Sequence, residues 1–192
     1  HTHHKYFTEM EEAGIIVDVF SPLKFPKILQ SVNYRNHKKI VVIDGKIGYT
    51  GGFNVKDEYI KGVDWGVWRD LHFSIEGSGA QGLQMVFITD WFYTPGEFLN
   101  DARFFQPTKA YGNNPMQVVS AEPLGYNANI MQGMLVAITR ARKRIYIENP
   151  YIVPTDEILT ALQNAALSGL DVKLIMPERS DNPKVQWASG TY

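Results

Sequence analysis

Residues 36–54 read NHKKIVVIDGKIGYTGGFN, and this stretch decides the fold. The β-branched run from Ile40 to Ile43 is followed by Asp44-Gly45 and then by a second short strand-like segment that begins at Lys46. Asp-Gly between two such runs is typical of the tight turn of a β-hairpin. We therefore expect two antiparallel strands joined at Asp44.

The residues just before the first strand carry side chains suited to phosphate chemistry. His37 and Lys39 are two positions apart, and an extended backbone places such residues on one face. An imidazole can act as a nucleophile or proton carrier near neutral pH, and an ammonium can hold a phosphate oxygen. The pair therefore indicates a phosphoryl-transfer site.

The spacing of these residues is specific. The pattern His-x-Lys-x-x-x-x-Asp, completed by Asp44, should arise by chance in roughly one or two chains in a hundred. Requiring Gly51 and Asn54 at their offsets lowers that expectation by roughly another hundredfold. The plain alternative, in which His37 is a surface histidine and Asp44 only a turn residue, is therefore disfavoured.

The segments around the hairpin predict further elements. The run from Ile15 to Phe20, between Gly14 and Pro22, predicts a mostly buried strand after a helix that ends at Ala13. Four apolar residues at helical spacing before Pro95 predict an amphipathic helix. These four are Leu83, Val86, Phe87 and Trp91.

The chain is expected to contain two domains. The best candidate linker is Gly112-Asn113-Asn114-Pro115, which divides residues 1–113 from residues 114–192. The second part alternates helix and strand, which is typical of an α/β layer structure. Its expected elements are a helix with Met131, Met134, Leu135, Ile138 and Ala141 on one face, a strand at Ile145 to Ile147, a helix from Thr155 to Gly169, and a strand at Val172 to Met176.

Composition excludes several classes of protein. The net charge of the 192 residues is −1, so no bulk positive field for nucleic acid is expected, and cysteine is absent, which removes disulfides and thiolate nucleophiles. No run of about 18 apolar residues appears, so the chain as given is expected to be soluble. The histidines at positions 1, 3 and 4 are not expected to bind a metal, because a terminal cluster seldom has supporting ligands.

Taken together, these motifs resemble the phospholipase D superfamily, whose motif runs His-x-Lys, four residues, Asp, six residues, and Gly-Gly or Gly-Ser before x-Asn. Within it, the bacterial cardiolipin synthases are most similar. The resemblance covers essentially the whole chain. It is carried by the stretch from Asn36 to Asn54, by Asp57-Glu58-Tyr59, Trp68-Arg69-Asp70, Asp90-Trp91 and Pro150-Tyr151-Ile152-Val153-Pro154, and by Ala166, Gly169 and Val172.

The resemblance implies a layered α/β fold with a mixed sheet flanked by helices. Family members combine two similar halves, each with one motif, and this chain has one. Residues 1–113 are then the first half, lacking its N-terminal start, and residues 114–192 open the second. A second motif is expected within roughly 20 to 45 residues beyond Tyr192, if the family spacing holds.

The resemblance also implies roles for single residues. His37 is expected to be a catalytic histidine, with Lys39 and Asn54 on the phosphate. Asp44 belongs to the catalytic motif, but it is expected to shape the turn rather than to contact substrate. Asp70 is the candidate carboxylate that fixes the tautomer of the His37 imidazole. The expected phosphate-binding set is completed by Gly51, Gly52 and Glu58.

The expected activity is transfer of a phosphatidyl group between two phosphatidylglycerols, giving cardiolipin and glycerol through a phosphohistidine, without metal or other cofactor. Expected partners are anionic membrane lipid and the second half of the same protein or a homodimer partner, with no nucleic acid. The family implies the bacterial cell membrane, with the catalytic domain on the cytoplasmic side. Two alternatives remain open: a nuclease or phosphodiesterase that completes its site by dimerisation, and an inactive phospholipid-binding fragment.

Overall fold

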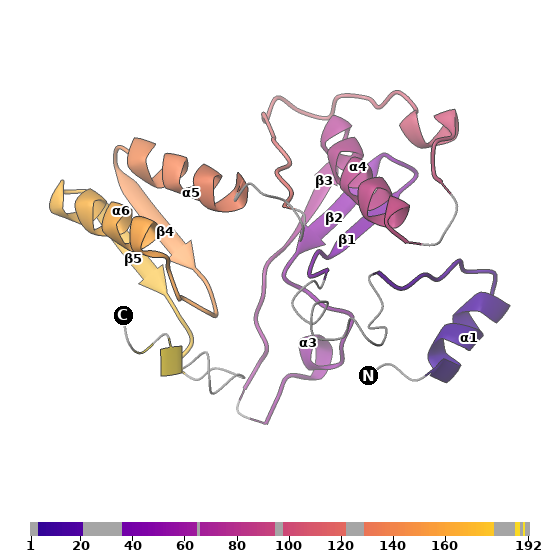
Figure 1. Ribbon diagram of the computed structural model, residues 1–192, viewed down its shortest axis with the longest axis horizontal. Coiled ribbons are helices and arrows are strands. Elements are labelled where there is room, and N and C mark those ends of the chain that lie inside the picture. Colours follow the sequence, from indigo (N-terminus) through magenta and orange to yellow (C-terminus); the bar gives the residue numbers. More distant parts are fainter. Residues whose placement is uncertain are drawn as a thin grey trace. The chain divides into compact units, whose positions relative to one another are not determined.

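A computed structural model describes residues 4–20, 36–64, 66–94, 98–121 and 129–178, together with residues 187, 188 and 190. The chain divides into two compact units, His1–Leu124 and Gly125–Tyr192, which are described separately below (Figure 1). Among the described residues, no helix has the length and apolar character that a membrane crossing requires.

The first unit is built on an antiparallel sheet of three strands in the order β1-β2-β3. These strands are β1 (Ile40–Ile43), β2 (Ile47–Gly51) and β3 (His72–Glu76). Ile43 pairs with Ile47, so the predicted hairpin is confirmed. Asp44 and Gly45 have φ angles of 51° and 65°, in the left-handed region that Asp tolerates and Gly adopts readily.

Helix α4 (Ser78–Phe92) packs on this sheet (Figure 1) and confirms the helix expected before Pro95. Its buried apolar residues are Ala80, Leu83 and Ile88. Of the residues expected on its apolar face, Leu83 is buried whereas Phe87 is 41% exposed. Gly48 of β2 lies directly beneath the helix, where a Cβ would come within 2.8 Å of Leu83 Cδ1.

Helix α1 (His4–Glu12) agrees with the helix expected to end near Ala13, but the strand expected after it is wrong. Residues 15–19 have no strand conformation, and Ile15 and Ile16 are 47% and 74% exposed. A strand needs a neighbouring strand for its hydrogen bonds, and an apolar run alone does not supply one. The described residues of this unit also form two short elements, α3 (Glu58–Lys61) and the 3₁₀ helix η1 (Ala102–Phe105).

The first unit continues past the expected linker at residues 112–115. A Cβ at Gly79 would meet Met116 Cε at 2.5 Å, and one at Gly82 would meet Val118 Cγ2 at 2.9 Å. The segment that follows the linker therefore packs closely along α4, which explains why this unit extends to Leu124. That the two units are the two halves of a phospholipase D-like molecule remains a prediction.

In its described residues, the second unit is a strand-helix-strand arrangement preceded by one more helix. Its elements are α5 (Asn129–Arg140), β4 (Arg144–Glu148), α6 (Asp156–Leu167) and β5 (Asp171–Ile175), as the alternating pattern predicted. Strands β4 and β5 are parallel, and Ile138, Ile158 and Leu162 form the buried core. With the antiparallel sheet of the first unit, this confirms the expected α/β class with both strand directions.

Replacing Gly48 by alanine tests the packing of α4 on the hairpin. We expect Gly48→Ala to lower the free energy of unfolding by about 1 to 3 kcal/mol, because the new methyl group overpacks the contact with Leu83 and Ala80. Gly112→Ala is the matched control, since nothing lies within 4 Å of a Cβ there, and it should change stability by less than about 0.5 kcal/mol. Equal urea midpoints for both variants would contradict this packing.

A second test concerns the exposed contact between β4 and β5. Tyr146 Oη donates to Asp171 Oδ2 at 2.6 Å, and Lys173 Nζ donates to the same oxygen at 2.9 Å. Both hydrogen bonds lower the pKa of Asp171, and the bond from Tyr146 has the larger effect. The associated stabilisation is present above the ordinary pKa of Asp, about 3.9, and is lost as the pH falls through the lowered value. We expect Tyr146→Phe to raise the pKa of Asp171 in an NMR titration, whereas Tyr111→Phe should leave it unchanged.

Candidate functional site

The motif residues other than Asp44 gather at one end of the three-stranded sheet. Ile40 opens β1 opposite Thr50, so Lys39 and Gly51 leave this strand pair at the same end. Gly51 in turn pairs with His72 of β3, and the amide of Gly52 donates to the carbonyl of Leu71 at 2.9 Å. Three segments that are separate in sequence therefore meet there: residues 36–39, residues 51–54 and residues 70–72.

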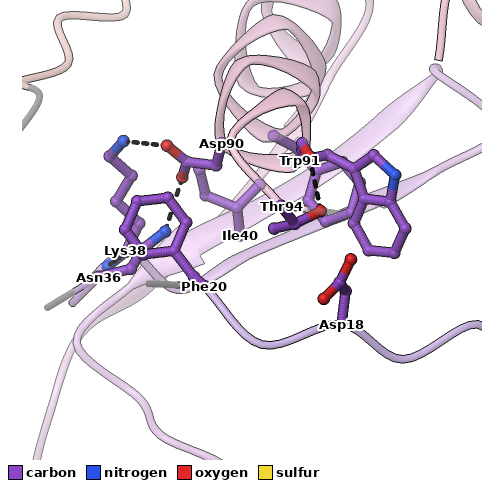
Figure 2. Close-up of a pocket in the computed structure, with 9 residues that line it drawn as sticks. Asp18, Phe20, Asn36, Lys38, Ile40, Asp90, Trp91 and Thr94 are labelled. Atoms are coloured by element: carbon purple, nitrogen blue, oxygen red, sulfur yellow. Dashed lines mark hydrogen bonds and ion pairs between the residues drawn. The ribbon is translucent and has the colours of Figure 1, made fainter. Parts of the chain in front are cut away.

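Side chains alternate in the segment that enters β1. Asn36 and Lys38 face helix α4, where both contact Asp90 (Figure 2). His37 is exposed, and Lys39 Nζ donates to the His37 carbonyl at 2.7 Å. The side chains on either side of His37 thus lie toward α4; that His37 and Lys39 share the opposite face remains a prediction.

The contact on the α4 side uses both oxygens of a buried carboxylate. Asp90 Oδ2 accepts from Asn36 Nδ2 at 2.8 Å, and Asp90 Oδ1 accepts from Lys38 Nζ at 2.6 Å. These groups border a cavity of about 210 Å³ (Figure 2). Its lining residues are Asp18, Phe20, Asn36, Lys38, Ile40, Phe87, Asp90, Trp91 and Thr94.

The two glycines of the motif permit close contact with the segment before β3. At Gly51, with φ of 155°, a Cβ would lie 2.4 Å from the Leu71 carbonyl oxygen and 2.6 Å from His72 Cα. At Gly52, a Cβ would instead meet the Asp70 carboxylate, whose Oδ1 is only 2.0 Å away. Gly51 is thus enclosed by backbone, whereas Gly52 faces a side chain that can rotate.

Asn54 is held by local hydrogen bonds. Its Nδ2 donates to Tyr59 Oη at 3.1 Å, and that hydroxyl donates to the Gly52 carbonyl at 3.3 Å. The Phe53 ring packs on Tyr59 and stacks on His72, with ring centroids 5.1 and 5.4 Å apart. The Gly-Gly-Phe-Asn turn is therefore braced by an aromatic cluster that the sequence pattern did not reveal.

The remaining predicted residues occupy different places. Asp44 lies in the turn at the opposite end of β1 from His37, so it is not brought to the motif histidine. Asp70 lies against Gly52 and accepts from the Leu71 amide at 2.7 Å; its proposed contact with His37 remains a prediction. Glu58 pairs with Lys56 at 3.2 Å, and a backbone hydrogen bond and this lysine lower its pKa.

Neither a catalytic nor a binding role was predicted for Asn36, Lys38 or Asp90. The available signal was the period of two: if His37 and Lys39 face outward, then Asn36 and Lys38 must face inward and need a partner. Across the part of the chain that the structure describes, no cluster of three or more His, Cys, Asp or Glu could hold a metal ion.

The two glycines give a matched pair of variants. We expect Gly51→Ala to lower the free energy of unfolding by about 2 kcal/mol or more, because it combines a positive φ with a backbone clash. Gly52→Ala should cost less than about 1 kcal/mol, because the Asp70 side chain can turn away. Urea denaturation compares the two, and a more damaging Gly52→Ala would contradict this geometry.

Comparison with known proteins identifies relatives over nearly the whole chain. Residues 134–192 match the family model described as cardiolipin synthase, PLD-like domain. The chain is 41% identical over 190 residues to cardiolipin synthase 2 of Bacillus cereus, covering 97% of this chain and 37% of that protein. It is 40% identical over 190 residues to the cardiolipin synthase of a Geobacillus species, and this match covers 97% of this chain and 38% of that protein.

The chain thus spans somewhat more than a third of the length of the curated relatives that it matches. Identity of about 40% over 190 residues, together with the match of the domain model, establishes common descent. Over 190 residues the chain is therefore similar in sequence to bacterial cardiolipin synthases, and its residues 134–192 match the PLD-like domain described for cardiolipin synthase.

Proposed function

We propose that this chain supplies one histidine motif of a phosphatidyltransferase that makes cardiolipin and glycerol from two phosphatidylglycerols. The observation that carries the proposal is the contact that the two residues flanking His37 make with helix α4. Asn36 and Lys38 contact α4 while His37 is exposed. Relatives at about 40% identity are named cardiolipin synthases, which supports the choice of reaction.

In the proposed first step, a neutral imidazole nitrogen attacks the phosphorus of one phosphatidylglycerol. A P–N bond forms, the P–O bond to the glycerol headgroup breaks, and a second histidine donates a proton to the departing glycerol oxygen. In the second step, the headgroup hydroxyl of another phosphatidylglycerol gives its proton to that histidine and attacks phosphorus. The P–N bond then breaks and cardiolipin is released.

His37 is one of the two histidines in this proposal, as nucleophile or as proton carrier. Lys39 would hold a non-bridging phosphate oxygen, and Asn54, with Gly51 and Gly52, would approach the same group. Glu58 would complete this surface, because its carboxylate can accept a hydrogen bond from a headgroup hydroxyl. Asp70 would fix the tautomer of His37 after its side chain turns from Gly52.

The second histidine would come from another part of the same protein or from a second copy of it. We expect the site to work at a bacterial cell membrane, on its cytoplasmic side, with the anionic headgroups of that membrane as partners. No metal or organic cofactor takes part in the proposed steps. Nucleic acid is not an expected substrate, because the net charge is −1.

The proposal is tested with the full-length protein and vesicles that contain phosphatidylglycerol. Wild-type protein should form cardiolipin and glycerol in equal amounts, and His37→Ala should lower this rate by at least about 10³-fold because it removes a nucleophile or proton carrier. Lys39→Ala should lower it by about 10²-fold. Lys46→Ala, a lysine in the turn of the same hairpin, is the matched control and should retain the wild-type rate.

Three results would contradict the proposal. Wild-type activity in His37→Ala would remove the histidine from the reaction. Hydrolysis of a DNA phosphodiester by the wild type, with no cardiolipin formed, would favour the nuclease alternative. Binding of phosphatidylglycerol without any product would favour a lipid-binding module.

A further inference from the structure

We infer that Asp90 is a positioning residue for the His37 motif, acting through Asn36 and Lys38. This inference deepens the proposed function and rests on it where catalysis is concerned. Asp90 lies on helix α4, 54 residues from Asn36 and 52 residues from Lys38, yet it contacts the side chains of both. It therefore connects the helix to the residues immediately before and after His37.

The charged part of this contact, Lys38 and Asp90, is largely withdrawn from solvent, whereas Asn36 is exposed. Its two hydrogen bonds use both carboxylate oxygens of Asp90, and the exposed fractions of the Lys38 and Asp90 side chains are 22% and 12%. A charge pair in such surroundings is coupled more strongly than an exposed pair, so loss of either partner is expected to disturb the other. Lys38 and Asp90 therefore act as a unit.

Asn36 extends this contact to the backbone around His37. While its Nδ2 donates to Asp90, its Oδ1 accepts from the Lys38 amide at 2.9 Å. A side-chain oxygen that accepts from the amide two residues on closes an Asx turn, and the residue inside this turn is His37. The His37 peptide is consequently held on both sides, and Lys39 Nζ adds a bond to the His37 carbonyl at 2.7 Å.

By binding Asn36 and Lys38, Asp90 also restricts the directions of His37 and Lys39. If Asp90 releases Asn36 and Lys38, the segment can rotate and His37 and Lys39 lose their common direction. A displacement of about 1 Å at a reacting group can cost about 10²-fold in rate. A loss of Asp90 should therefore lower the rate of the chemical step much more than it weakens substrate binding.

The kinetic test uses Asp90→Asn and Lys38→Met in the full-length protein with phosphatidylglycerol vesicles. Each variant should lower kcat for cardiolipin formation by about 10- to 100-fold and change KM by less than about threefold. Lys38→Arg should recover most of kcat, because its guanidinium can still pair with Asp90. The double variant should be no slower than Asp90→Asn alone, because the two residues act as a unit.

The control is Lys5→Met, which removes the lysine of an exposed ion pair with Glu9 and should leave kcat unchanged. A direct structural readout is hydrogen exchange at the Lys38 amide. Asp90→Asn should speed this exchange at least about tenfold, without speeding exchange at the β2 amides, because the Asx turn loses its support. In Lys5→Met the Lys38 amide should exchange as in the wild type.

Each outcome decides the inference. Wild-type kcat in Asp90→Asn overturns it, as does a rate that falls only in proportion to the folded fraction measured by circular dichroism. Failure of Lys38→Arg to recover activity while folded also overturns it. If the wild type makes no cardiolipin, the proposed function fails by itself, and hydrogen exchange then decides: unchanged exchange of the Lys38 amide in Asp90→Asn overturns the inference.

Discussion

The bonds from Asp90 to Asn36 and Lys38 are the interaction on which the candidate site depends. Alternation along an extended segment gives side chains opposite directions, but it does not say which set faces inward. A buried carboxylate settles this, because it requires donors and the inward set supplies an amide and an ammonium. His37, which lies between these two donors, is exposed.

A second constraint acts where β2 ends. Gly51 and Gly52 bring this end of the strand against the segment before β3, where a Cβ at either glycine would collide with residues 70–72. The aromatic rings of Phe53, Tyr59 and His72 then brace the turn from the side. Polar bonds orient the histidine segment, and close backbone packing places the Gly-Gly-Phe-Asn segment beside it.

Much of this fold was predictable because its signals are local. Each signal lies within or directly beside the element that it predicts. Examples are the turn at Asp44-Gly45, the helical spacing around Leu83 and Ile138, and Gly169 after α6. The strand expected at Ile15 to Phe20 failed because pairing depends on a partner elsewhere in the chain. Asp90 was missed as a site residue for the same reason, since its partners are more than 50 residues away.

The two-stranded sheet of the second unit has edges that can pair with further strands. In the described residues, β4 and β5 pair only with each other, so each presents an outer edge of peptide N–H and C=O groups. Two strands alone make a marginal sheet in water, and open edges are templates for added strands. Additional backbone pairing, from the same protein or another chain, would therefore stabilise this unit; without it, the edges would make the unit prone to aggregate.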